Sequence, residues 1–232
     1  MDDDARTSRE VEAPTTEWLV NQIAHALRNP IFAALVQLEA LALRSGQAPG
    51  AEMTAETVYK QLKRLEHTVD EMLLYGRPAA LRRTPVDVGR LVGEVADAYR
   101  RGEREEPAEV SLSSSTDGLQ AHWDADAVRT ILERLMDNAV QHTATPHRIE
   151  IRVSPDHDDQ VMISIADDGD GIAADLADRI FLPFFPQHRG RPGLGLAIAA
   201  KFTDLHGGRL TVASRPQGGA EARVVLPLGG PE

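Results

Sequence analysis

The sequence contains no cysteine, and this absence excludes several kinds of chemistry. Disulfide bonds, thiol catalysis and cysteine-based zinc sites are impossible in such a chain. The 232 residues also include no apolar run of about 18 residues, the length needed for a membrane-spanning helix. The chain also has no excess of basic residues: 36 acidic residues outnumber 25 basic ones, and the formal net charge is −11. A nucleic-acid backbone would therefore be repelled on average, although these totals leave room for a local basic patch.

The N-terminus lacks the features of a targeting signal. Residues 1–4 are Met-Asp-Asp-Asp, which cannot form the positively charged start of a signal peptide. Without a signal or a spanning helix, we expect a cytoplasmic protein with no membrane span. Residues 1–14 are polar and end at Pro14, so we interpret them as a disordered leader, with an extension of the following helix as the alternative.

Two apolar stripes follow the leader. Residues 15–45 have apolar side chains at steps of three and four, which predicts a helix. Residues 46–50 contain two glycines and a proline and break this pattern, and residues 54–75 then show a heptad repeat. The pattern predicts an antiparallel helical hairpin. Because a hairpin of about 60 residues buries too little surface to be stable alone, we expect a dimeric four-helix bundle. The stripes are Leu19, Ile23, Leu27, Ile31, Leu35, Leu38 and Ala42, then Val58, Leu62, Leu65, Val69 and Met72.

The rest of the chain has a different pattern. Asp87 and Asp124 are each placed to cap the N-terminus of an amphipathic helix. A further helix is expected over 196–206, before the glycine pair at 207–208. The pattern predicts an α+β sandwich, with helices on one face of a mostly antiparallel sheet. We therefore divide the chain into a leader (1–14), a helical hairpin (15–78) and a sandwich domain (79–230). The expected strands span 109–113, 120–123, 148–154, 160–166, 209–214 and 221–226.

The first helix contains one histidine. At helical spacing, His25 shares a face with Asn29, whereas Ile23 and Leu27 point to the opposite side. Pro30 cannot donate a backbone hydrogen bond and should bend the helix just after the histidine. On spacing alone, this pattern is more typical of an ordinary exposed histidine than of a reactive one.

Polar residues in the sandwich domain suggest a nucleotide site. Asn138 falls near the edge of an apolar helical stripe, where its amide needs a partner such as a phosphate-bound magnesium ion. Asp167 ends a strand just before Gly169 and Gly171, a spacing that lets the backbone approach a flat ligand. A carboxylate there can accept a hydrogen bond from an exocyclic amine such as that of adenine. An ordinary helix-end asparagine and a tight acidic or calcium-like loop are the alternatives.

A second glycine-rich segment, 190–195, precedes the last expected helix. Its backbone N–H groups and the helix N-terminus are suited to phosphate oxygens. The segment is not a Walker A loop, because no Gly-Lys-Ser/Thr follows, and it is not a Rossmann motif, because no parallel βαβ unit surrounds it.

The order of these motifs resembles that of the sensor histidine kinases of two-component systems. The resemblance covers about 18–228, and the motifs are weak singly but specific in combination. Their order is His25-x-x-Arg28-Asn29-Pro30, Asn138, Asp167-x-Gly169-x-Gly171, Phe181-x-Pro-Phe-Phe185 and Gly193-x-Gly195.

The resemblance implies a fold and a set of site residues. The family pairs a dimeric phosphoacceptor hairpin with a Bergerat-type ATP-binding domain. His25 matches the phosphoacceptor, and Asn29 matches the position implicated in dephosphorylating the partner regulator. Asn138 matches the magnesium-binding asparagine and Asp167 the adenine-reading aspartate, whereas 181–190 is similar to a short ATP lid. The remaining nucleotide-binding matches are His142, Gly169, Gly171, Gly193, Leu194 and Gly195.

The resemblance also implies an activity. A family member would use ATP and Mg²⁺ to phosphorylate His25 in a homodimer, then pass the phosphoryl group to an aspartate. No receiver pattern is present in this chain, so we expect a separate response regulator, with the input signal from a separate sensor protein and no direct contact with nucleic acid. A phosphotransfer or phosphatase module with weak kinase activity is the first alternative, and a Bergerat-fold ATPase switch like gyrase relatives is the second.

Four positions depart from the family pattern. Ala26 stands where an acid usually accepts the imidazole proton, a loss that typically slows reactions about 10²–10⁴-fold. Arg134 replaces a frequent second asparagine, and Gln141 replaces a lysine that commonly reaches phosphate. Arg191 and Pro192 replace small residues before Gly193, and the proline removes one phosphate-facing N–H.

Overall fold

The computed structural model describes most of the chain from Ala51 onward and a short part before it. The described chain forms two compact units, Met1–Leu65 and Glu66–Glu232. In full, the described residues are 23, 27–29, 31–36, 51–76, 80–102, 108–116, 118–142, 148–157, 159–173, 176, 179–185 and 193–229.

The described residues of the first unit are helical. Residues 27–29 and 31–36 are helical, and the long helix α2 (Ala51–Gly76) contains the boundary between the two units. The predicted apolar stripes are only partly buried within one chain: Val58 is buried, but Leu35 and Leu62 are each more than half exposed. These exposed side chains provide the apolar surface that a helical bundle with a second chain would cover. In the part of the chain that the structure describes, no helix is long and apolar enough to cross a membrane.

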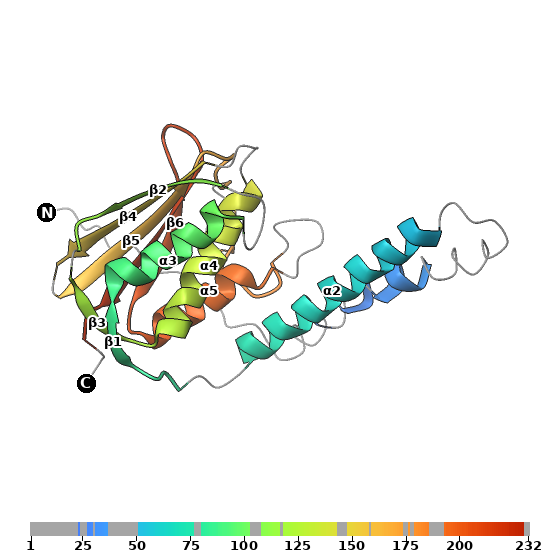
Figure 1. The fold of residues 1–232 in the computed structure, drawn as a ribbon, viewed down its shortest axis with the longest axis horizontal. Coiled ribbons are helices and arrows are strands. Elements are labelled where there is room, and N and C mark those ends of the chain that lie inside the picture. Colours follow the sequence, from blue (N-terminus) through green and yellow to red (C-terminus); the bar gives the residue numbers. More distant parts are fainter. Residues whose placement is uncertain are drawn as a thin grey trace, which may run out of the picture. The chain divides into compact units, whose positions relative to one another are not determined.

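The second unit is built on a five-stranded sheet with three helices on one face (Figure 1). The strand order is β2-β4-β5-β7-β6; β2 pairs with β4 in parallel, and the other pairs are antiparallel. This arrangement, following a helical region, confirms the predicted fold class. The strands are β2 (Glu109–Ser114), β4 (Arg148–Asp156), β5 (Gln160–Asp167), β6 (Arg209–Ser214) and β7 (Ala220–Pro227), and the helices are α3 (Val88–Arg100), α4 (Ala125–His142) and α5 (Gly195–Leu205).

Alternation of side chains explains why this sheet has one covered face. On β4, Ile149, Ile151 and Val153 are buried, whereas Arg148 and Arg152 are exposed and lie on the other face. Because successive side chains of a strand point to opposite faces, the apolar set forms the core under the helices and the charged set forms an open face.

The two predicted helix caps are confirmed. Asp87 Oδ1 accepts a hydrogen bond from Arg90 N at 2.9 Å, and Asp124 Oδ1 accepts one from Ala127 N at 3.1 Å.

A separate pair of strands contains one strand that the sequence analysis predicted and one that it did not. The short strand β1 (Thr84–Asp87) pairs antiparallel with β3 (Gln120–Trp123). Its four residues include a proline and have no alternating pattern, so only the distant partner strand defines it.

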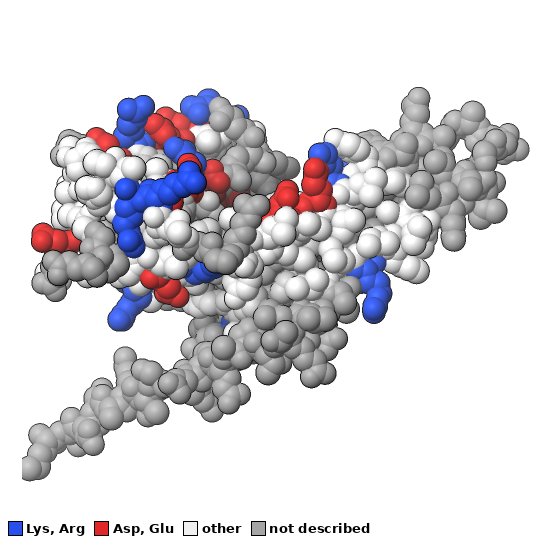
Figure 2. Space-filling view, turned by 90° about the horizontal axis from the view of Figure 1, so that it is seen from below, with Lys and Arg blue, Asp and Glu red and all other residues white. Residues whose placement is uncertain are grey.

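Charges of both signs are intermixed over the face of the molecule seen in Figure 2. The ion pairs of the second unit include Glu94 with Arg129 at 2.7 Å and Glu109 with Arg148 at 3.2 Å. Exposed pairs of this kind contribute little to stability, so the fold depends mainly on the apolar core.

A buried histidine joins the end of α5 to the start of α4. The His206 side chain is 1% exposed, its Nδ1 donates to Phe202 O at 2.8 Å, and its Nε2 accepts from Asp124 N at 3.2 Å. The ring must be neutral to make both bonds. Burial lowers the pKa of His206, and the nearby charge of Arg83 lowers the pKa further.

We expect this histidine to make stability depend on pH. As pH falls below the usual histidine pKa of 6.5, the unfolded chain binds a proton at His206 that the folded chain resists. The neutral His206 therefore costs no stability above pH 6.5. Between pH 6.5 and the lower pKa of the folded state, the free energy of unfolding decreases by up to about 1.4 kcal/mol for each pH unit. Urea unfolding from pH 7.5 to 5 should show a shallower pH slope for His206→Gln than for wild type. His157→Gln, which changes an exposed turn histidine, should keep the wild-type slope; equal slopes in all three proteins would contradict the prediction.

Candidate nucleotide-binding site

Asp167 ends β5 with its carboxylate held by the backbone. The residue is 4% exposed, and its Oδ1 accepts hydrogen bonds from Gly169 N at 2.9 Å and Ala220 N at 3.0 Å. Among the described residues, no hydrogen bond reaches the other oxygen, Oδ2. A carboxylate oxygen without a hydrogen-bond partner, on a residue that is itself buried, is a strong acceptor site for a ligand N–H group.

A mainly apolar cavity of about 130 Å³ lies beside this carboxylate. Asp167 and Asn138 are the polar side chains in its wall. A cavity of apolar walls with a few placed polar groups suits a flat heteroaromatic ligand. The lining residues are Asn138, Asp167, Gly171, Ile172, Ala173, Leu176, Ile180, Phe185, Leu196 and Ala220.

The loop after Asp167 is fastened to the turn between β6 and β7. Ser214 Oγ donates to Ile172 O and accepts from Ile172 N, both at 2.9 Å. Gly171 has φ +77°, and a Cβ there would lie 3.0 Å from Ser214 Oγ and 3.1 Å from Gly219 O. Glycine is therefore required at Gly171 both by the backbone conformation and by the close approach of the β6–β7 turn.

A second, smaller cavity of about 50 Å³ brings Asn138 together with the glycine segment before α5. Asn138, Ile180 and Leu196 line both cavities, which therefore adjoin. Arg134 lies in the wall of the second cavity, where its Nη1 is 3.3 Å from Glu71 Oε1 and 3.7 Å from Asp137 Oδ2. The cavity is lined by Glu71, Arg134, Asp137, Asn138, Gln141, Ile180, Gly193, Leu194, Gly195 and Leu196.

The segment that starts α5 is packed closely against Phe185. Gly193 has φ +68°, and a Cβ there would lie 2.1 Å from Phe185 O. Leu194 is fully buried, and α5 begins at Gly195 without a side-chain cap. The Leu194 side chain thus belongs to the core, so only its backbone is available to a ligand. Uncapped N–H groups at a helix N-terminus favour anions such as phosphate.

Several predicted site residues lie elsewhere or outside the described part. Asn29 is helical and exposed in the first unit, next to the equally exposed Arg28. His25 and 186–192 are outside the described residues, as is the side chain of His142, the last residue of α4. The structure thus groups Asn138, Asp167, Gly169, Gly171, Gly193, Leu194 and Gly195 around two adjoining cavities.

Two contributions to this site were missed from the sequence. Ser214 and Ala220 flank the β6–β7 turn, and both bond to the loop that begins at Asp167. The only local signal was the glycine pair Gly218-Gly219, which marks a tight turn but not its place beneath a distant loop.

The donor set fits a magnesium ion that arrives with a nucleotide. Asn138 supplies an amide oxygen where the two cavities meet. Within the described ranges, no group of three or more His, Cys, Asp or Glu side chains is arranged to hold a metal. Mg²⁺ is commonly held by few protein groups together with phosphate oxygens and water, which this arrangement suits.

Comparison with known proteins agrees with this geometry. Residues 123–230 match the family model of the histidine kinase-, DNA gyrase B- and HSP90-like ATPases, which defines the class of the second unit and implies ATP binding. Residues 19–80 match the His Kinase A (phospho-acceptor) domain. The chain belongs to the sensor histidine kinases of two-component systems.

Individual relatives support the same assignment. The chain is 26% identical to the sensor histidine kinase ZraS of Klebsiella oxytoca over 97% of its own length and 48% of the relative. It is 31% identical to the sensor histidine kinase RppB of Synechocystis over 88% of its own length and 47% of the relative. The chain thus spans about half the length of the curated relatives it matches. The crystal structure of full-length ShkA in complex with AMPPNP has a TM-score of 0.65 and 25% identity, covering 94% of this chain and 47% of ShkA.

Proposed function

We propose that this chain is an ATP-dependent protein-histidine kinase that phosphorylates His25 and passes the phosphoryl group to an aspartate of a separate response regulator. The partner-free Oδ2 of Asp167 in the wall of an apolar cavity is the observation that carries the proposal. Adenine offers that oxygen its exocyclic amine, whereas guanine presents a carbonyl oxygen at the same ring position and would be repelled. The AMPPNP bound to ShkA supports the choice of nucleotide.

The phosphates would extend from the base cavity into the adjoining one. Gly193, Leu194 and Gly195 supply backbone N–H groups at the start of α5, and Arg134 supplies a positive charge. Asn138 would hold Mg²⁺, which, when bound, offsets negative charge on the phosphates. We assign Asn138, Asp167, Gly169, Gly171, Gly193, Leu194 and Gly195 to ATP, and His142 from the family pattern.

The chemical step requires a nitrogen of the neutral His25 imidazole to attack the γ-phosphorus in line. A P–N bond forms, the bond from the γ-phosphorus to the bridging oxygen breaks, and ADP leaves with the electron pair. The imidazole proton must pass to a base. In the second reaction, a response-regulator aspartate attacks the same phosphorus and His25 is released. Asn29, exposed one helical turn from His25, is the candidate for a separate dephosphorylating activity, in which water attacks the aspartyl phosphate of the regulator and releases inorganic phosphate.

The assembly we propose is a homodimer through the hairpin. Ile31, Leu35 and Leu62 are all at least 45% exposed within one chain, although their positions belong to the predicted apolar stripes. A four-helix bundle formed with a second copy would cover them. A separate sensor protein would supply the signal.

Labelling with ATP tests the proposed function directly. Full-length protein incubated with Mg²⁺ and γ-labelled ATP should acquire protein-bound label that is lost in acid and kept in base. ATP labelled at the α-phosphate should transfer none. Failure of wild-type protein to bind or to use ATP would contradict the kinase assignment.

A glutamate introduced after the histidine should accelerate labelling. Ala26 cannot accept the imidazole proton, so Ala26→Glu is expected to raise the initial rate about 10²-fold. The rate should be measured at saturating ATP, with Ala26→Gln as the uncharged control of equal size. A brisk wild-type rate that Ala26→Glu leaves unchanged would mean that another group takes the proton.

Ala26 also supports the second candidate function, a phosphotransfer or phosphatase module with weak kinase activity. This reading predicts that wild-type protein dephosphorylates a phosphorylated response regulator while acquiring little label from ATP. Loss of that dephosphorylation in Asn29→Ala, with dimerisation intact, would support this candidate.

A further inference from the structure

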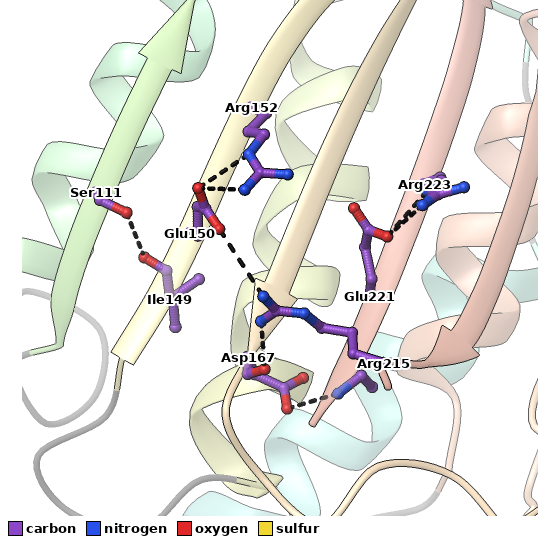
Figure 3. A network of polar contacts seen from close by, with 9 residues as sticks. Ser111, Ile149, Glu150, Arg152, Asp167, Arg215, Glu221 and Arg223 are labelled. Carbon is purple, nitrogen blue, oxygen red and sulfur yellow. Dashed lines mark hydrogen bonds and ion pairs between the residues drawn. The ribbon is translucent and has the colours of Figure 1, made fainter. Parts of the chain in front are cut away.

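We propose that Arg215 is a positioning residue that aligns Asp167 for base recognition, an inference that rests on the proposed binding of ATP. Arg215 directly follows β6, in the turn that leads to β7. Its Nη1 donates to the backbone oxygen of Asp167 at 2.9 Å. Figure 3 shows its guanidinium between Glu150 on β4 and Asp167 at the end of β5. The side chain thus links the open face of the sheet to the residue whose carboxylate faces the base cavity.

The guanidinium of Arg215 is itself held in place. With its amide oxygen turned toward the guanidinium, Gln217 accepts from Nη2 at 2.7 Å and from Nε at 3.1 Å. Glu150 Oε2 lies 4.0 Å from Nη2. The Arg215 side chain is 19% exposed, so these contacts are only partly screened by water. A rigid fork with partners on several sides can fix the position of the carbonyl it binds.

Arg215 and Ala220 act on the same residue from the same turn. Ala220 N holds the carboxylate Oδ1 of Asp167, while Arg215 holds its backbone oxygen. Together they hold Asp167 at its side chain and its main chain, and no described hydrogen bond occupies Oδ2 in this residue of the cavity wall. Removing one of the two contacts allows the end of β5 to shift, and a small shift is enough to misalign one hydrogen bond to a base.

The other arginines of the open sheet face lack this connection. Arg223 pairs with Glu221 at 2.6 Å, and Arg152 pairs with Glu150 at 2.7 Å, and both side chains are more than half exposed. Neither has a described contact with Asp167. Arg223 therefore provides a matched control: an arginine of the same face, in an ion pair, with no part in the base site.

The test compares nucleotide binding by full-length wild type, Arg215→Met, Arg215→Lys and Arg223→Met. In Arg215→Met, the Kd for ATP should rise about tenfold and the Kd for GTP should stay within twofold of wild type. The KM for ATP should rise by the same factor, with kcat at saturating ATP unchanged. Arg215→Lys should recover part of the loss, and Arg223→Met should bind like wild type.

Each other result argues against the proposal. ATP binding by Arg215→Met within twofold of wild type would overturn it, as would equal losses for ATP and GTP, which would indicate general loosening. An equal loss in Arg223→Met would assign the effect to sheet stability. If wild-type protein binds no ATP, the proposed function fails together with this inference; wild-type binding that is insensitive to Arg215 overturns only the inference.

Discussion

Replacing His25 by glutamine is expected to remove all acid-labile label from protein incubated with γ-labelled ATP and Mg²⁺. Glutamine has a similar size but no nitrogen nucleophilic enough to attack phosphorus. The loss should be complete, because no other chemistry in the proposed mechanism accepts the phosphoryl group. ATP binding should stay within twofold of wild type, because both cavities are lined by residues of the Glu66–Glu232 unit and His25 belongs to the other unit.

A histidine away from both cavities provides the control. His157 lies in the exposed turn after β4, and His157→Gln should keep both labelling and ATP binding. Label that persists in His25→Gln would place the phosphoacceptor elsewhere and contradict the assignment. Loss of ATP binding in His25→Gln would show that the substitution damages the catalytic unit rather than removing a nucleophile.

Alanine at Gly219 should have the largest effect on the nucleotide site itself. Gly219 has φ +79°, and a Cβ there would lie 2.0 Å from Asp167 O and 3.0 Å from the Cα of Asp168. These are backbone atoms and cannot rotate away, so the end of β5 must move. We expect the Kd for ATP to rise at least ~100-fold, equivalent to ~2.7 kcal/mol. Titration with a fluorescent ATP analogue measures this change.

Substitution of the neighbouring glycine distinguishes displacement of β5 from backbone strain in the turn. Gly218 has φ +97°, and a Cβ there would meet nothing within 4 Å. Gly218→Ala should be destabilised by about 1 to 2 kcal/mol from the left-handed backbone, and Gly219→Ala by more, because its Cβ also displaces backbone atoms; urea unfolding measures both. Only Gly219→Ala should lose ATP binding. Equal losses in both variants would attribute the effect to strain in the turn, and normal binding by Gly219→Ala would contradict the role of this close approach.

Secondary structure could be predicted from the sequence where the residues that determine an element lie within that element. Asp87 and Asp124 could be predicted as helix caps because a cap bonds to an N–H three residues later. Strands such as β4 could be predicted because alternation reports one buried face. The strand β1 could not, since its pairing depends on β3, which is distant in the sequence.

In the nucleotide-binding site, too, local features could be predicted from the sequence and contacts between distant segments could not. Glycines at Gly171 and Gly193 are visible in the sequence, but the residues they approach, Ser214 and Phe185, are not. The contacts of Arg215 depend on the register of β6 and β7, which no local pattern encodes. Leu194 shows the reverse: it lies between two glycines of a predicted nucleotide loop, yet its side chain is in the core because the loop also has to anchor α5.

The bond between Asp167 and Ala220 has a consequence for the chain as it is synthesised. Asp167 leaves the ribosome well before Ala220, and until then its carboxylate lacks one of the two amides that orient it. Ser214, which fastens the same loop, is also made late. A nascent chain can therefore complete most of its sheet without a competent base site. Nucleotide cannot assist the early steps of folding and becomes a stabilising ligand only when the β6–β7 hairpin is in place.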